Sequence, residues 1–196
     1  AAAGHQAPEK LMSKSFRGGA RALQALNPEM SLTGDLFGRA LLNDGKEYAA
    51  GARSGLFFRG LGLHLQSALD PFSFAKVAVS FSPEGAEFEE AYITWTNVLP
   101  QLTLTAGRFR QQLGVVNRWH KHALDQFDFP LMLTEPLGPG GLAGVGVSMN
   151  WLMPAVWADE QNLELQITNA ANPKAFAGTY FSLPAGLMHL RSYWDL

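Results

Sequence analysis

Two histidines separated by one residue, His120 and His122, have the types and spacing best suited to chemistry in this 196-residue chain. If the segment is extended, both imidazoles lie on the same side of the backbone and can share a ligand. Imidazole binds zinc, copper and nickel, and the nearby carboxylates of Asp125 and Asp128 could add oxygen ligands. The spacing allows a site for zinc or another divalent metal. The alternative is a polar loop whose histidines hydrogen-bond to carboxylates or backbone.

The residues around this histidine pair are rich in positive charge. Four cationic side chains lie within a short stretch: Arg108, Arg110, Arg118 and Lys121. If the stretch folds into a channel, these side chains could select anions, as rings of basic residues do in anion pores. The alternative is a rim on which the cations face water or lipid headgroups.

No other arrangement of residues predicts catalysis, so we expect no enzymatic activity. The glycine-rich stretch 138–144 lacks the lysine and the following helix of a phosphate-binding loop. Glu89 and Glu90 are adjacent, and adjacent residues of a strand point to opposite faces, so these two carboxylates are not expected to act together.

Composition limits the class of protein. The net charge of -2 and the pI near 6.2 argue against nucleic acid as a partner. Charged residues make up only 16% of the chain, yet no apolar run is long enough for a membrane-spanning helix. The absence of cysteine excludes a disulfide framework. A β domain with a large core and a β-barrel with a lipid-facing wall both fit these properties.

Hydrophobic residues recur with a period of two, which predicts eight strands that each have one apolar and one polar or small face. The expected strands cover residues 30–40, 61–69, 75–81, 90–95, 102–106, 145–151, 163–167 and 188–196. The pattern slips at Arg59, and again at Arg108 and Arg110 beyond Gly107. A β-bulge would explain such a slip, and arginines at a membrane rim are the alternative. The fold class expected is an all-β, antiparallel, up-and-down transmembrane β-barrel.

In a barrel of this kind the polar face of each strand is the interior. The candidate pore-lining residues are Arg39, Lys76, Arg108, Arg110, Arg118, Lys121, His189 and Arg191. Acidic side chains fall on the same face of the strands, so we expect an internal network of ion pairs, because buried charges need partners.

Long and short connections alternate for most of the chain. Proline-containing turns such as Asp70-Pro71 and Leu99-Pro100 are short, whereas the connection over residues 113–143 is nearly thirty residues long. Outer-membrane barrels have short periplasmic turns and long external loops. We therefore expect a barrel over residues 30–196 with a long loop at 113–143, preceded by a periplasmic linker or short helix at 1–29.

Several short motifs, taken in their order along the chain, resemble a family of outer-membrane proteins of Gram-negative bacteria. These are the porin-like barrels related to phosphate-selective porins, some of which are labelled zinc-regulated TonB-dependent outer-membrane receptors. The motifs are Asn27–Asp35, Leu69–Pro71, Glu89–Ile93, Ala106–Phe109, Asn117–His122, Asp128–Pro130 and Arg191–Asp195. No plug domain of the kind that a true TonB-dependent receptor carries before its barrel is expected, and we therefore do not expect active transport.

The resemblance implies a bacterial outer-membrane location, contact with outer-membrane lipid and other membrane-protein subunits, and passage or binding of small solutes, anions or metal ions among them. Barrels of this family are usually about twice as long, so we expect a fragment of a larger barrel or a small member. Eight strands can close, but side chains nearly fill so narrow an interior. Two alternatives remain: a structural or partner-bound barrel with a plugged lumen, and a soluble lipocalin-like barrel that binds an apolar ligand.

Overall fold

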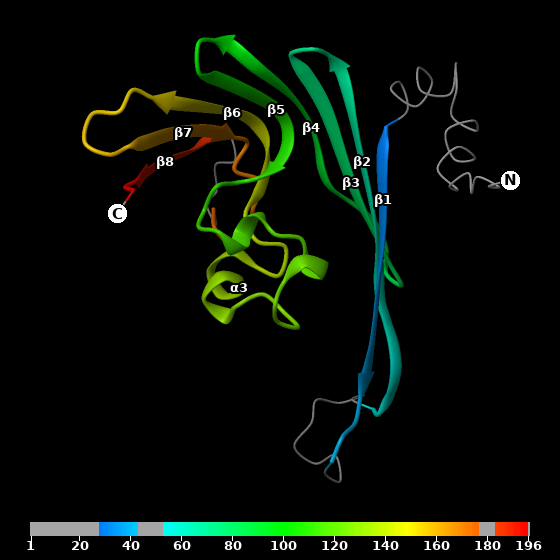
Figure 1. Cartoon of the computed structure of the whole chain (residues 1–196). Helices are drawn as coiled ribbons and strands as arrows, with labels where there is room; N and C mark the ends of the chain where they lie inside the picture. The colour runs from blue at the N-terminus through cyan, green and yellow to red at the C-terminus, as the bar shows by residue number, and fades with distance from the viewer. Residues whose placement is uncertain (1–27, 43–52, 177–182, 196) are drawn as a thin grey trace, which may run out of the picture.

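The fold is all-β, as the alternation predicts. The computed structural model describes residues 28–42, 53–176 and 183–195. Eight strands form one antiparallel sheet in which each pairs with its neighbours in sequence (Figure 1). The strands are β1 (Glu29–Arg39), β2 (Gly55–Asp70), β3 (Ser73–Ser82), β4 (Gly85–Leu99), β5 (Leu102–Arg110), β6 (Ala143–Met153), β7 (Glu160–Thr168) and β8 (Ala185–Tyr193).

Each predicted strand corresponds to one of these eight, and most extend further than the alternation indicated. The expected linker at 1–29 lies outside the described residues up to position 27, and Glu29 already belongs to β1. The long connection is present between β5 and β6, and we call residues 111–142 the crossing segment. It contains three short helices that the sequence did not predict: η1 (Val116–Arg118), η2 (Lys121–Ala123) and α3 (Leu131–Leu137).

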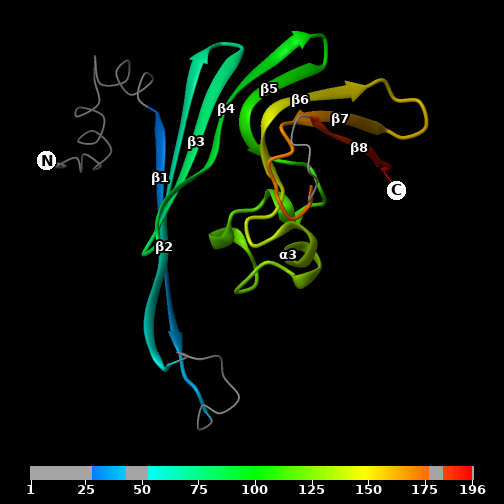
Figure 2. The same ribbon diagram turned by 180° about the vertical axis from the view of Figure 1, so that it is seen from behind.

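The sheet curves, and the crossing segment lies on its inner side. In Figures 1 and 2 the strands β6–β8 turn away from the direction of β1–β3, and the segment that carries α3 lies in the angle between the two groups. The side chains on this inner side come from the polar face of the strands. Hydrogen bonds and ion pairs between the crossing segment and β2 and β4 show that it packs on that face.

Burial in this sheet is the reverse of that in a soluble domain. The largest fully buried side chains are polar, namely Gln111, Gln161 and Asn117. Apolar side chains on the opposite face are exposed, for example Leu32 at 65% and Met188 at 73%. Globular proteins in water place large apolar residues inside. This sheet does the opposite, because its polar face is covered and its apolar face is exposed.

Two β-bulges change which residues point to the polar face. In the β1–β2 ladder Asp35 pairs with Gly60 and Leu36 with Phe58, so Arg59 is the extra residue. In the β3–β4 ladder Ala78 pairs with Glu90 and Val79 with Phe88, so Glu89 is the extra residue. The bulge explanation of the slip at Arg59 is therefore confirmed. It is wrong for Arg108 and Arg110, because β5 pairs with β6 from Leu102 to Arg110 without a register shift. The bulge at Glu89 was not predicted.

A pair of glycines allows close approach between neighbouring strands, of β5 to β4 at one glycine and of β6 to β7 at the other. Gly107 of β5 lies opposite Gly146 of β6. A Cβ atom on Gly107 would be 2.3 Å from the carbonyl oxygen of Ala91, and one on Gly146 would be 2.0 Å from that of Ile167. Because real Cβ atoms do not come so close, only glycine permits this backbone path.

Within the described residues β1 and β8 pair on one side only, and no β1–β8 ladder is present. The observed architecture is thus an eight-stranded up-and-down sheet. No helix in the described part of the chain is long and apolar enough to span a membrane.

Candidate functional site: the crossing segment on the polar face

Asn117 ties the two ends of the crossing segment together. Its side-chain nitrogen donates to the carbonyl oxygens of Gln111 (2.8 Å) and Leu142 (2.9 Å), and its side-chain oxygen accepts from the backbone N–H of Leu142 (2.7 Å). Asn117 is fully buried. The backbone N–H of Gln111 also donates to the carbonyl of Leu142. These bonds satisfy backbone groups at the base of the segment and close it into a compact loop.

His120 attaches the segment to β4. Its Nδ1 lies 2.5 Å from a carboxylate oxygen of Glu89, and its Nε2 lies 3.0 Å from one of Glu90. Both carboxylates reach one imidazole because the bulge at Glu89 breaks the alternation that would place them on opposite faces. The expectation that Glu89 and Glu90 cannot act together was therefore wrong. An imidazole with an acceptor at each nitrogen is fully hydrogen-bonded only when both nitrogens carry a proton.

Three imidazoles meet at this point. His64 of β2 lies with its ring edge-on to those of His120 and His122, at centroid distances of 4.8 and 5.1 Å, while His120 and His122 stack at 5.7 Å. Burial lowers the pKa of His120, but hydrogen bonds and charges from Glu89 and Glu90 outweigh burial and raise this pKa overall. Burial and the neighbouring His120 lower the pKa of His122. The cluster therefore favours one positive charge, located on His120.

Arg59 attaches the segment to β2. Its guanidinium is ion-paired with Asp35, donates to the carbonyl oxygen of Phe127 at 2.5 Å and lies 3.9 Å from the carboxylate of Asp128. It also lies over the ring of Phe127, 4.6 Å from the centroid. Arg59 is the extra residue of the first bulge, as Glu89 is of the second. Both bulges thus present a charged side chain to the crossing segment.

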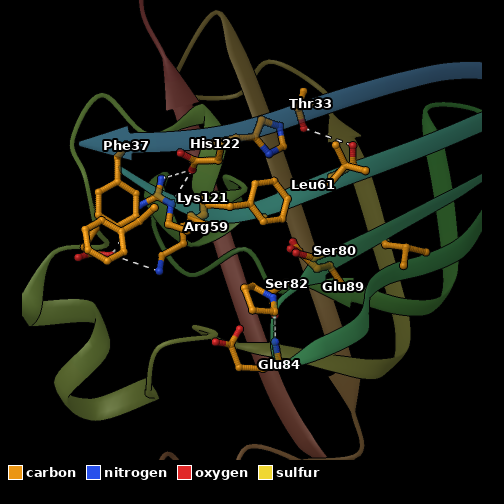
Figure 3. Close-up of a pocket in the computed structure, with 18 of the residues that line it drawn as sticks. Thr33, Phe37, Arg59, Leu61, Ser80, Ser82, Glu84, Glu89, Lys121 and His122 are labelled. Carbon is orange, nitrogen blue, oxygen red and sulfur yellow. Dashed lines mark hydrogen bonds and ion pairs between the residues drawn. The ribbon is translucent and has the colours of Figure 1, made fainter. Parts of the chain in front are cut away.

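Several cavities lie beside these contacts. A groove of about 490 Å³ runs between the segment and strands β1–β3, with Asp35, Arg59, His64 and His122 in its lining. Figure 3 shows Arg59, Lys121 and His122 around this groove. A second cavity of about 360 Å³ lies over the polar face, where its lining includes Lys76, Tyr92, Thr105, Ser148 and Gln166. Hydroxyl, amide and charged groups line the second cavity, so it suits water or a polar solute.

The four basic side chains predicted around the histidine pair differ in burial and in ion-pair partner. Arg110 is mostly buried and ion-paired with Glu89 at 3.0 Å, and it also donates to the carbonyl oxygen of Gly140. Arg108 lies 3.7 Å from the exposed carboxylate of Glu87. Lys121 lies 3.1 Å from Asp128 at the surface. Arg118 is exposed and lines the cavity over the polar face.

The remaining candidate pore-lining residues lie on the polar face of their strands. Lys76 forms an ion pair with Glu90 at 2.8 Å, which confirms at this position the expected internal network of both signs. Arg191 donates to the side-chain oxygen of Asn162 at 3.2 Å, and His189 lies opposite Glu164 in the β7–β8 ladder. Arg39 is exposed, near the stacked rings of Phe37 and Phe57.

The candidate metal ligands His120, His122, Asp125 and Asp128 are not brought together as one site. His120 and His122 are adjacent, but Asp128 is engaged by the cations Arg59 and Lys121, and Asp125 is exposed. Within the described residues no group of three or more histidine, cysteine, aspartate or glutamate side chains is arranged to hold a metal ion. His120 instead has the carboxylate contacts of the alternative interpretation, so none of the four residues is assigned as a ligand.

Sequence reasoning did not assign four residues to this site: Arg59, whose bulge was expected but not its contact with the crossing segment, Glu89 as the second bulge residue, Asn117 as the tie, and His64 as the third imidazole. A signal for the bulges was present in the spacing of apolar residues. Phe58 precedes Leu61 by three positions, and Phe88 precedes Ala91 by three, where a regular strand has two. No comparable local signal marks Asn117 or His64, because their partners are distant in the sequence.

Comparisons with known proteins add one relative. A protein of Aquifex aeolicus (strain VF5), described as an uncharacterized protein, is 33% identical over 92 residues. These residues make up 47% of this chain and only 19% of the relative, which is therefore more than twice as long. No family model matches the chain, and no solved structure matches it.

Proposed function

We propose that this chain forms part of the wall of an outer-membrane β-barrel of porin-like type, through which small polar solutes pass or in which they bind. In this proposal the crossing segment lies inside the barrel as a constriction. The chain catalyses no reaction, and selectivity comes from the width and the polar lining of the passage. The resemblance to porin-like barrels stays a prediction and is consistent with this proposal.

The observation that carries the proposal is the reversed burial of the sheet. Thr94, Ser148, Glu164, Gln166 and Thr168 are buried on one face. The exposed apolar side chains of the other face include Leu32, Leu36, Phe58, Val145, Val147, Ile167, Met188 and Leu190. Leaving a large contiguous apolar surface in water is unfavourable by about 25 cal/mol per Å². Lipid on the apolar side and water on the polar side remove this cost, as in outer-membrane barrels.

The same observation argues against a lipocalin-like barrel. That fold would hold an apolar ligand against inward-pointing apolar side chains. Here the side chains around the cavity over the polar face are largely hydroxyls, amides and charges. A soluble carrier of an apolar ligand would need the sheet to close with its apolar face inward, which is the opposite of the observed arrangement.

A structural barrel with a plugged lumen is the second candidate, favoured by the position of the crossing segment. The segment covers part of the polar face and is fixed at Asn117, His120 and near Arg59. The two candidates differ in whether a continuous water path remains beside the segment.

Two experiments test the proposal. First, the purified protein is transferred from detergent into detergent-free buffer and followed by light scattering. We expect aggregation, and a monodisperse protein in plain buffer would refute the membrane location.

Second, the full-length protein that contains this chain is inserted into planar lipid bilayers. Stepwise conductance is the expected result for a channel. If the protein is inserted, as shown by protease protection in liposomes, and no steps are seen, the plugged structural barrel is correct and the channel is not.

A further inference from the structure

We propose that the contact of His120 with Glu89 and Glu90 is a proton-controlled clasp, which holds the crossing segment on the polar face when His120 is charged and releases that part of the segment when it is neutral. The clasp concerns the regulation of the proposed constriction. It rests on the proposed function for its effect on solute passage, whereas the attachment itself can be measured without any conductance.

The geometry at His120 distinguishes the two protonation states. A charged imidazole donates from Nδ1 to Glu89 and from Nε2 to Glu90, so both short contacts are hydrogen bonds to a carboxylate. A neutral imidazole carries one proton, so one nitrogen would present a lone pair to a carboxylate oxygen. That contact is repulsive at the observed distances. Deprotonation therefore loses a hydrogen bond and the counter-charge of two carboxylates together.

The other charged groups that face His120 determine the pH range in which its contact with Glu89 and Glu90 is stable. Arg110 of β5 pairs with Glu89, and Lys76 of β3 pairs with Glu90, so each carboxylate keeps one partner after His120 becomes neutral. His64 of β2 and His122 of the segment contact the His120 ring, and Asp35 lies further along the same groove. A second proton on His64 or His122 would place two like charges in contact, which opposes attachment at low pH.

The attachment of the crossing segment at Arg59 does not change over the pH range in which His120 titrates. Arg59 holds the segment through the carbonyl oxygen of Phe127 and through Asp128. A guanidinium stays charged at any pH at which the protein is folded. Asn117 fixes the base of the segment with uncharged hydrogen bonds. Loss of the His120 contact should therefore free the part of the segment around η2 while the base and the Arg59 contact hold.

The sign of the response follows from the pKa of His120. Because hydrogen bonds from the carboxylates raise this pKa above its ordinary value of 6.5, attachment gains stability that is fully present below 6.5. That stability is lost as the pH rises through the raised pKa of the attached state. The clasp is thus closed in mildly acidic medium and open in alkaline medium.

The experiment uses the complete protein in detergent micelles or liposomes. The given sequence contains no cysteine, so cysteines introduced by Ala123→Cys in η2 and Glu84→Cys in the β3–β4 turn can be spin-labelled specifically in it. Both positions are exposed and neither belongs to the clasp. Electron paramagnetic resonance then gives the distribution of distances between the two labels. We expect one narrow distribution at about pH 6 and a broad one at about pH 9, with the midpoint above 6.5.

Two variants separate the clasp from a general loss of structure. His120→Gln never carries a charge, so its distribution should be broad at every pH. His120→Lys keeps a charge and should remain narrow up to about pH 9. His122→Gln is the matched control, since His122 stacks on His120 without contacting a carboxylate among the described residues, and it should keep the transition.

The proposal is overturned if the wild-type distribution does not change between the two pH values, or if His120→Gln retains the transition. Conductance is not part of this readout. A protein that changes its label distances yet forms no channel would support the clasp and refute the channel. A protein that forms a channel without a change in label distances would support the channel and refute the clasp.

Discussion

Glu89 and Glu90 are consecutive residues of one strand, yet both carboxylates contact the same imidazole, that of His120. A regular strand forbids this, since adjacent side chains point to opposite faces. The bulge at Glu89 permits it by adding one residue to β4 without a partner on β3. The site on the polar face therefore depends on an irregularity of the backbone as much as on residue type.

The two histidines of the crossing segment should have pKa values on opposite sides of the ordinary value of 6.5. His120 should lose its proton above that pH and His122 below it, because carboxylates favour the charge of the first while burial and the first histidine oppose the charge of the second. Nuclear magnetic resonance of the imidazole Cε1–H groups measures both. A depressed pKa of His122 contributes stability present above 6.5 and lost as the pH falls, so attachment should be strongest near 6.5. Equal pKa values would contradict the charge arrangement.

Asn117→Ala should loosen the base of the crossing segment. The change leaves the buried N–H of Leu142 without its side-chain acceptor and removes a donor from two carbonyl groups. An unsatisfied buried polar group costs about 1–3 kcal/mol, so the loss should be about 2 kcal/mol. Hydrogen exchange at Leu142 measures it. The control is Gln126→Ala, an exposed amide of the same segment, which should leave exchange unchanged.

Gly146→Ala should destabilise the sheet more than Gly186→Ala. The new Cβ at position 146 would lie 2.0 Å from the carbonyl oxygen of Ile167, so the β6 or β7 backbone must move. Nothing lies within 4 Å of a Cβ at Gly186, which pairs with the same Ile167 from β8. Overpacking typically costs about 1–3 kcal/mol. Denaturant unfolding in micelles compares the two, and equal midpoints would show that the approach at Gly146 is not tight.

Val147→Lys tests what covers the apolar face. In lipid, a lysine near the middle of the wall costs about 2–4 kcal/mol, whereas in water an exposed valine can be replaced at almost no cost. Ala155→Lys, in the exposed β6–β7 connection, adds the same charge away from the strands. Folding into liposomes, followed by protease protection, should fail or weaken for the first variant only. If both variants fold equally well, lipid does not cover Val147.

The number and order of the strands could be predicted because a period of two is a local property of the sequence. The slip at Arg59 was also visible, since a charged residue stood where the apolar side chain was due. The bulge at Glu89 was harder to see because Glu87, Glu89 and Glu90 are all polar, and only the distance from Phe88 to Ala91 indicates the extra residue.

The candidate site could be predicted only in part. The histidine pair indicated either a metal site or a polar loop whose histidines hydrogen-bond to carboxylates. The structure contains the second arrangement, at His120. Which carboxylates take part depends on packing between β4 and a segment thirty residues later, and His64 joins from β2. Contacts at such separations leave no local pattern in the sequence, so the roles of Asn117 and His64 could not be read from it.

The two bulges also separate the pairing of the strands from the attachment of the crossing segment. Removing the residue at position 59 or 89 would restore a regular ladder in which Phe58 still lies opposite Leu36 and Phe88 still lies opposite Val79. Only the charged side chain that each bulge presents to the crossing segment would be lost. Deleting either residue should therefore keep the order and faces of the strands and weaken the attachment of the segment.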